Sequence, residues 1–310
     1  MSRDQRSAKL AQVLALLLPT LLLLGLAELA LRLAGFGADY RGESHMIVAS
    51  DDPVLVHEYR PDYRVESQGL EYRTNAAGFR DREFTPKAPD AFRIAVVGDS
   101  VTFGFGEAVE DSFPKQLERR LAERPGPRIE VFNLGIAGYN SLQEVRLVET
   151  RGLVWEPDLL VLAYVHNDNK EDGADGGLTL HFKRSASRLY DWLGVRLRRL
   201  SRRIGRDVVT EAFDELARLA REHELPVVVM IVPQVRFRDG QWSRPERHRA
   251  VRELALARGF RVLDLLDAFV AEDFESRMRD SIHPNPSGYA LIARELGSFL
   301  EQEELLPPAG

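Results

Sequence analysis

Short apolar runs alternate with segments of helical periodicity from residue 92 to the end of the chain. Five runs rich in Val, Ile and Leu have the length of buried strands, and between them apolar residues recur at three- and four-residue steps. Apolar strands separated by helices are typical of a parallel sheet covered on both faces. The predicted strands lie at residues 92–98, 128–135, 158–165, 226–233 and 260–266. The predicted helices lie at about 113–123, 142–152, 208–223, 244–258 and 286–301. This pattern predicts an α/β domain over residues 92–305.

The N-terminal part of the chain has a different pattern. Leu10 to Ala27 carries no charge, and Arg3, Arg6 and Lys9 precede it. At about 1.5 Å per residue, such a helix nearly spans a hydrocarbon core of about 30 Å. Positive charge before the apolar segment favours export of the residues after it. We therefore expect a cytoplasmic N-terminus (1–9), a single transmembrane anchor (10–35) in the cytoplasmic membrane and an exported domain. A cleaved signal peptide and a buried helix are the alternatives.

Two further segments stand apart from the alternating pattern. Residues 36–91 alternate apolar and polar positions and are broken by Pro61, Gly69 and Gly78, which predicts one or two β-hairpins at the edge of the domain. Residues 169–206 form a polar and then basic insertion. Within it, residues 188–204 predict a helix with arginines on one face. That helix either covers the domain with a solvated basic face or lies on an anionic membrane surface or acidic polymer.

Composition narrows the choice of chemistry. The net charge is −6, so nothing in the overall charge points to nucleic acid. The chain has no cysteine, which excludes disulfides, thiolate nucleophiles and lipoprotein anchoring. His57, His181, His223 and His248 are scattered along the chain and do not predict a metal site.

The sequence "VVGDSVTFGFG" at residues 96–106 ends the first predicted strand in a turn of small residues. Such a turn either binds a phosphate or presents a nucleophile. The glycine spacing matches neither the dinucleotide fingerprint nor the nucleoside-triphosphate loop, and Asp99 occupies the place where a phosphate would lie. The turn therefore favours Ser100 as a nucleophile, with Asp99 structuring the turn.

A serine nucleophile needs a base, a carboxylate that orients the base, and donors for the oxyanion. Asp280 and His283 lie three residues apart in "DSIHPNPSGY", after the last predicted strand. Gly138 follows the second strand and Asn167 follows the third. Because the carboxyl ends of parallel strands meet at one edge of the sheet, we expect these residues to lie together with Ser100.

These residues, in this order, resemble the four sequence blocks of the SGNH, or GDSL-type, hydrolase family. The resemblance covers residues 92–300 and implies a flavodoxin-like three-layer α/β/α sandwich with a mainly five-stranded parallel sheet. It implies that Ser100 is the nucleophile and that Asp280 and His283 complete the triad. It also implies an oxyanion hole made by the amides of Ser100 and Gly138 and by Asn167, and no cofactor.

One position departs from the family pattern, because Val165 stands where the third block usually has glycine. The sequence "YRTNAAGFRDREF" and the single N-terminal span resemble a bacterial membrane-anchored branch of the family, whose relatives act on O-acetyl groups of polysaccharides. The resemblance thus implies a serine esterase that hydrolyses an acyl ester, such as O-acetyl, on an envelope carbohydrate or lipid. An O-acyltransferase and a non-catalytic glycan-binding protein are the alternatives. The expected partners are this substrate and the membrane, the latter through the N-terminal helix and, in one alternative, through helix 188–204.

Overall fold

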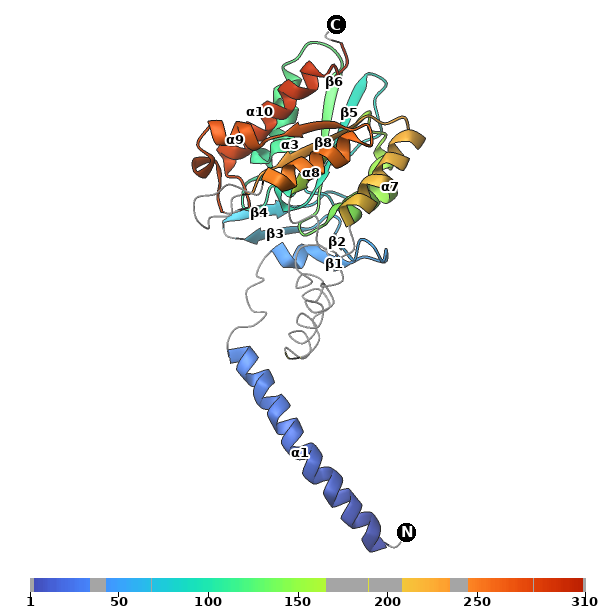
Figure 1. The fold of residues 1–310 in the computed structure, drawn as a ribbon, viewed down its shortest axis with the longest axis vertical. Coiled ribbons are helices and arrows are strands. Elements are labelled where there is room, and N and C mark those ends of the chain that lie inside the picture. The colour runs from blue at the N-terminus through green and yellow to red at the C-terminus, as the bar shows by residue number, and fades with distance from the viewer. Residues whose placement is uncertain are drawn as a thin grey trace.

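In the computed structural model, the five apolar runs form a parallel sheet with the order β6-β5-β7-β8-β9 (Figure 1). The strands are β5 (Ala91–Gly98), β6 (Arg128–Gly135), β7 (Leu159–Val165), β8 (Val227–Val232) and β9 (Arg261–Asp264). All four neighbouring pairs are parallel, with Gly98 opposite Gly135. The strand order is that of flavodoxin-like sheets, in which the order of the strands reverses between β5 and β7 and ligands bind at the carboxyl edge.

The structure describes residues 3–33, 43–67, 69–165, 189, 208–234, 245–280 and 282–308. The side chains of residues 3–17 and 43–44 are outside the description as well. Asn167 therefore lies outside the described residues. The predicted insertion 169–206 with its basic helix also lies outside them, except for Leu189.

Helices cover both faces of the sheet, as the apolar strands require. The helices of the body are α2 (Ser100–Phe103), α3 (Phe113–Ala122), α4 (Ser141–Leu147), α7 (Val208–Glu222), α8 (Pro245–Leu256), α9 (Leu266–Ala271) and α10 (Pro286–Gln302). Helices α3, α9 and α10 pack on one face and α4, α7 and α8 on the other. Every residue of β7 is buried, and Leu160 and Leu162 contact one layer while Val161 contacts the other. The expected three-layer α/β/α arrangement is therefore present.

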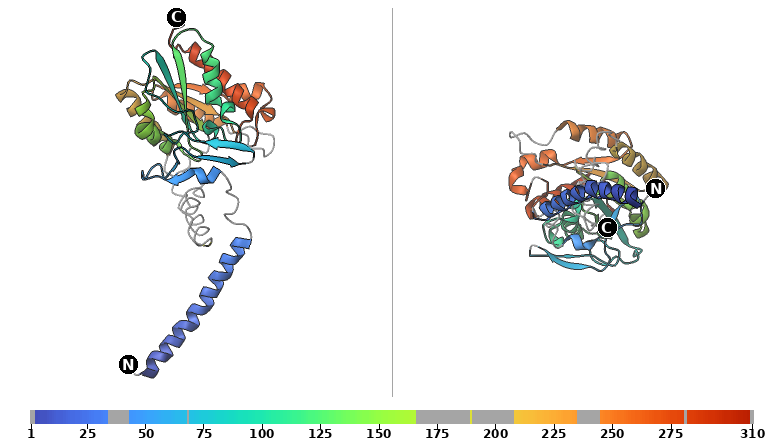
Figure 2. Two further views of the ribbon diagram at one scale, coloured as in Figure 1. Left: turned by 180° about the vertical axis from the view of Figure 1, so that it is seen from behind. Right: turned by 90° about the horizontal axis from the view of Figure 1, so that it is seen from below.

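Residues 46–84, which we call the N-terminal arm, contain two antiparallel strand pairs. The first pair is β1 (Ile47–Ala49) with β2 (His57–Tyr59), and the second is the hairpin of β3 (Arg64–Ser67) with β4 (Leu70–Arg73). Apolar residues of the arm join the same buried cluster as the α4–α7 face of the sheet: Met46, Leu55, Tyr59, Tyr72 and Phe79. The arm is thus a part of the core and not only an edge, and it crosses the body at the end nearest α1 (Figures 1 and 2).

Helix α1 (Arg3–Leu33) extends away from the α/β body (Figure 1). Its described side chains begin at Leu18. Across the described part of the chain, no helix combines the length and the apolar character that a membrane crossing requires. The predicted transmembrane anchor at 10–35 is therefore not confirmed.

Candidate active site

The turn after β5 places Ser100 at the carboxyl edge of the sheet. Asp99 is fully buried, and its Oδ1 accepts a hydrogen bond from the amide of Val101 at 2.9 Å, which caps the short helix α2. A Cβ at Gly98 would overlap the Thr102 side chain, so the close approach of strand and helix favours glycine at this position. Gly104 ends the helix at φ +78°. Asp99 therefore structures the turn, as the sequence predicts, and Ser100 begins the helix.

A closed loop before α10 holds Asp280 and His283. The amide of Arg279 donates to the carbonyl of His283 at 2.8 Å, and the amide of Asn285 donates to the carbonyl of Arg277 at 3.0 Å. Asn285 also caps α10 by accepting from the amide of Gly288 at 3.0 Å. The loop is thus fixed at both ends, and the cap of a long buried helix sets the position of His283.

The structure brings Ser100, His283 and Asp280 into one hydrogen-bonded chain. Nε2 of His283 lies 2.9 Å from Oγ of Ser100, and Nδ1 of His283 lies 2.8 Å from Oδ2 of Asp280. A hydroxyl, an imidazole and a carboxylate in this order can move a proton from the hydroxyl to the ring while the carboxylate holds the ring in place. The three residues are therefore arranged as a nucleophile, a base and an orienting group.

Asp280 is held in its ionised form by donors on both oxygens. Burial raises the pKa of this carboxyl, but donors that favour the charged form outweigh it and leave the pKa below its usual value. They are the His283 amide and ring and the Ile282 amide, and both amides donate to Oδ1 at 2.8 Å. The His283 ring also contacts Phe105, with 4.8 Å between ring centroids. The ring is thus restrained by the charge of Asp280 and by an aromatic contact.

Gly138 lies in a turn that the sheet register places beside Ser100. Gly135 ends β6 opposite Gly98, and the amide of Ile136 donates to the carbonyl of Gly98 at 3.0 Å. Gly138 has φ +87°, which favours glycine. Among the described residues its amide has no hydrogen-bond partner, as an oxyanion donor requires. Asn167, the third predicted donor, comes two residues after the end of β7 and lies outside the described residues.

A model of the GDSL-like lipase/acylhydrolase family matches residues 96–291, which run from the nucleophile turn to the helix after His283. The chain belongs to this family. It is an ester-hydrolysing enzyme of the acylhydrolase class. A search of curated proteins finds no match to the chain.

Solved structures similar to this acylhydrolase share little sequence with it. A lipase/acylhydrolase from Enterococcus faecalis is 18% identical with a TM-score of 0.48, covering 68% of this chain and 96% of that chain. The acetyl xylan esterase AlAXEase is 15% identical with a TM-score of 0.47, covering 67% and 100%. A two-domain esterase (CEX) active on acetylated mannans is 18% identical with a TM-score of 0.47, covering 71% and 52%.

A second carboxyl group of this acylhydrolase lies buried near Asp99. Glu144 is fully buried in α4, and neither of its carboxyl oxygens has a hydrogen-bond partner among the described residues. Burial, and then the charge of Asp99, raise the pKa of Glu144 well above its usual value. The buried position of Glu144 therefore favours its protonated form. Its burial could not be predicted, because a glutamate in a surface helix is ordinarily exposed.

The N-terminal arm supports the loop that follows the nucleophile helix. Arg80 is buried, and its guanidinium donates to the carbonyls of Phe103 at 3.1 Å, Gly104 at 2.7 Å and Glu107 at 2.7 Å. The amide of Gly106 donates to the Tyr72 hydroxyl at 3.2 Å. The arm thus satisfies backbone groups that would otherwise be buried without partners. Sequence reasoning assigned no role to Arg80, since its partners are backbone atoms of a distant segment.

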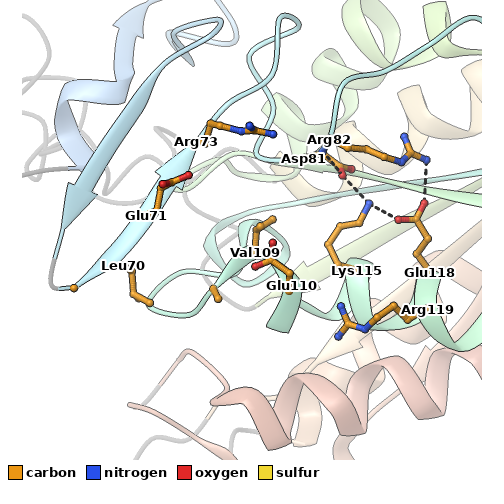
Figure 3. A pocket seen from close by; sticks show the side chains of 12 residues that line it. Leu70, Glu71, Arg73, Asp81, Arg82, Val109, Glu110, Lys115, Glu118 and Arg119 are labelled. Carbon is orange, nitrogen blue, oxygen red and sulfur yellow. Dashed lines mark hydrogen bonds and ion pairs between the residues drawn. The ribbon is translucent and has the colours of Figure 1, made fainter.

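A polar hollow of about 580 Å³ lies between β4, residues 108–110 and α3, and neither Ser100 nor His283 lines it (Figure 3). Lys115 pairs with Asp81 at 2.6 Å and with Glu118 at 2.8 Å on one wall. Arg73 and Arg119 also line the hollow, from β4 and α3, and neither has an ion-pair partner among the described residues. The lining can therefore offer unpaired guanidinium donors to a polar molecule.

Proposed function

We propose that this enzyme hydrolyses acyl esters through a Ser-His-Asp mechanism with an acyl-enzyme intermediate. The observation that carries the proposal is the unbroken chain from Ser100 Oγ to His283 Nε2 at 2.9 Å and from His283 Nδ1 to Asp280 Oδ2 at 2.8 Å. Ser100 Oγ attacks the acyl carbonyl carbon while His283 Nε2 takes the hydroxyl proton. Asp280 holds the ring and stabilises the imidazolium that forms.

The negative charge that develops on the carbonyl oxygen is stabilised by the amides of Ser100 and Gly138, with Asn167 as the third donor. The tetrahedral intermediate collapses, the carbon–oxygen bond to the alcohol breaks, and His283 gives its proton to the leaving alcohol. Water then attacks the acyl-enzyme with His283 as base. The products are the alcohol and the carboxylic acid, and Ser100 is regenerated without a cofactor.

We propose an acylated carbohydrate, with acetyl as the acyl group, as the substrate. The support is the polar hollow of about 580 Å³, whose lining is mostly charged and includes Arg73 and Arg119, for which the described residues offer no ion-pair partner. Sugar hydroxyls can accept hydrogen bonds from such groups, whereas the acyl chain of a lipid offers them no acceptor. We expect an Arg73→Ala, Arg119→Ala double variant to bind an acetylated oligosaccharide with lower affinity. We expect the same variant to hydrolyse a nitrophenyl ester at the wild-type rate.

Hydrolysis of nitrophenyl acetate by the full chain in detergent tests the mechanism. Ser100→Ala is expected to lower kcat about 10⁴-fold or more, because the nucleophile is lost. Ser298→Ala, a half-buried serine on α10, serves as the matched control and keeps the wild-type rate. Equal rates for wild type and Ser100→Ala would contradict the proposal. Adding an oligosaccharide acceptor distinguishes the transferase alternative, since transfer yields an acetylated acceptor in place of free acetate.

We also propose that α1 anchors the enzyme in the cytoplasmic membrane with the catalytic body exported. Its 31 residues measure about 46 Å, which exceeds a hydrocarbon core of about 30 Å. Its described leucines are mostly exposed, among them Leu18, Leu22 and Leu33. Fractionation of cells is expected to recover the uncleaved chain with the membranes until detergent is added. Recovery of a shortened chain in the soluble fraction would instead show a cleaved signal.

A further inference from the structure

Strand β2 of the N-terminal arm contacts the turn that contains Gly138. The ring of His57 lies with Nε2 at 3.1 Å from the carbonyl oxygen of Ala137, and the amide of Ala137 donates to the Tyr59 hydroxyl at 3.0 Å. The Tyr139 hydroxyl donates back to the carbonyl of His57 at 2.6 Å. The side chains of these three arm and turn residues, His57, Tyr59 and Tyr139, are all buried. Three hydrogen bonds therefore fasten residues on both sides of Gly138 to one strand.

The carbonyl of Ala137 and the amide N–H of Gly138 belong to the same peptide group. That group is planar and trans, so the C=O and the N–H point in opposite directions in one plane. A donor that fixes the carbonyl oxygen on one side of the turn consequently fixes the direction of the N–H on the other. Hydrogen bonding to the carbonyl also polarises the peptide and makes its N–H a better donor.

The protonation of His57 follows from its partner. A carbonyl oxygen only accepts, so Nε2 of His57 carries the proton and donates. Burial lowers the pKa of His57 to about 4, and the bond to Ala137 only partly offsets this. The ring is therefore neutral at neutral pH. Its edge-on contact with Tyr139, at 5.0 Å between centroids and 72° between planes, fixes its orientation.

We propose that His57 is a positioning residue that aims the Gly138 amide at the oxyanion through its hydrogen bond to the Ala137 carbonyl. The inference rests on the proposed function, because it takes Gly138 to be an oxyanion donor. His57 does not touch the substrate or the reacting atoms in this role. It acts through one peptide plane, so its loss lowers the rate of the chemical step and leaves substrate binding nearly unchanged.

Two substitutions at His57 separate positioning from packing. His57→Phe keeps a ring of similar shape against Tyr139 and removes the donor, whereas His57→Gln retains an N–H donor that can reach the same carbonyl. For nitrophenyl acetate we expect His57→Phe to lower kcat about 10- to 100-fold with KM changed less than about twofold, since losing an oxyanion donor altogether costs about 10²- to 10³-fold. We expect His57→Gln to restore kcat to within about threefold of wild type. The exposed His223→Phe is the matched control and keeps the wild-type values.

Thermal unfolding at neutral pH shows which variants are folded. Wild-type kcat in a folded His57→Phe variant would overturn the proposal, and so would equal losses in the Phe and Gln variants. If His57→Phe does not fold, His57→Leu takes its place, because it also removes the donor to the Ala137 carbonyl. An unchanged kcat in His57→Leu would then overturn the proposal. An inactive wild-type enzyme, or a fully active Ser100→Ala variant, would contradict the proposed function and not the role of His57.

Discussion

Replacing His57 by Gln is expected to reduce the loss in free energy of unfolding that this enzyme shows as the pH falls. In the wild type, burial lowers the pKa of His57 from 6.5 to about 4. Between these values the unfolded chain binds a proton that the folded chain does not, so the free energy of unfolding falls as pH falls from 6.5 to about 4. The ring faces the Ala137 carbonyl and the Tyr139 phenol, and the nearby charges of Glu58 and Arg151 pair with each other at 2.8 Å.

The magnitude follows from the difference between the two pKa values. A shift of about 2.5 units at about 1.36 kcal/mol per unit gives about 3 kcal/mol that His57 removes from the free energy of unfolding below pH 4. Small proteins are stable by only about 5–15 kcal/mol, so a loss of this size moves the acid midpoint measurably. Gln cannot be protonated in this range and keeps a donor for the carbonyl, so its variant lacks this contribution and resembles the wild type near pH 7.

Urea unfolding of both proteins at half-unit steps from pH 7 to pH 4, followed by circular dichroism, measures the effect. Other groups titrate in both proteins, so the informative quantity is the difference between the two free energies of unfolding at each pH. That difference is expected to move in favour of the Gln variant as the pH falls, with most of the change between pH 6.5 and 4. Parallel curves across the whole range would refute a buried, neutral His57.

Three other changes test the site and its supports. Asp280→Asn is expected to lower kcat for nitrophenyl acetate about 10⁴-fold. An amide N–H that faces Nδ1 of His283 forces the ring proton onto Nε2, which then cannot accept the proton of Ser100. An unchanged kcat would contradict the triad. Glu144→Gln is expected to raise the melting temperature more at pH 8 than at pH 5. Burial raises the pKa of Glu144, so above about pH 4.5 the folded wild type holds a proton more tightly than the unfolded chain does, and this contribution is absent from the Gln variant. Equal shifts at both pH values would contradict a raised pKa of Glu144. Arg80→Met is expected to cost about 3 kcal/mol or more in urea unfolding, because it leaves the Phe103, Gly104 and Glu107 carbonyls without this donor.

The α/β body was predictable because its signals are local. The predicted strand at 128–135 coincides with β6, and the one at 92–98 lies one residue inside β5. Such runs have few alternatives, since a continuous apolar stretch flanked by amphipathic helices buries its side chains only inside a covered sheet. Helix α9 (Leu266–Ala271) was not predicted, because six residues are too short to show a helical period.

That Ser100, Asp280 and His283 lie together was predictable for a similar reason. Asp280 and His283 lie in one loop, and Ser100 lies at the end of a strand, so motif and topology together place them at one edge. The distance between Ser100 and His283 could not be predicted, because the 2.9 Å contact depends on where the N-cap of α10 holds the loop. Nothing in the described residues tests Asn167.

The supporting residues could not be predicted, because their partners are distant in sequence and are backbone atoms. His57 contacts a carbonyl 80 positions away, and Arg80 contacts carbonyls 23 and 24 positions away. A backbone acceptor leaves no mark in the sequence of its own segment, so no motif pairs the two. His57 therefore counted only as one of several scattered histidines, and Glu144 resembled any helix surface residue.

The N-terminal arm provides contacts at the carboxyl edge that the sheet of this acylhydrolase does not provide. The two proposed oxyanion amides follow different strands, and beyond the pair Gly98 and Gly135 the ladder no longer controls their separation. Loops at the carboxyl edge have no core of their own, so their geometry depends on what packs against them. Arg80 supports the loop after Ser100, and β2 supports the turn at Gly138. One segment thus contacts both the loop after Ser100 and the turn at Gly138, and under the proposed function these contacts keep the two donors preorganised for a charge that exists only in the transition state.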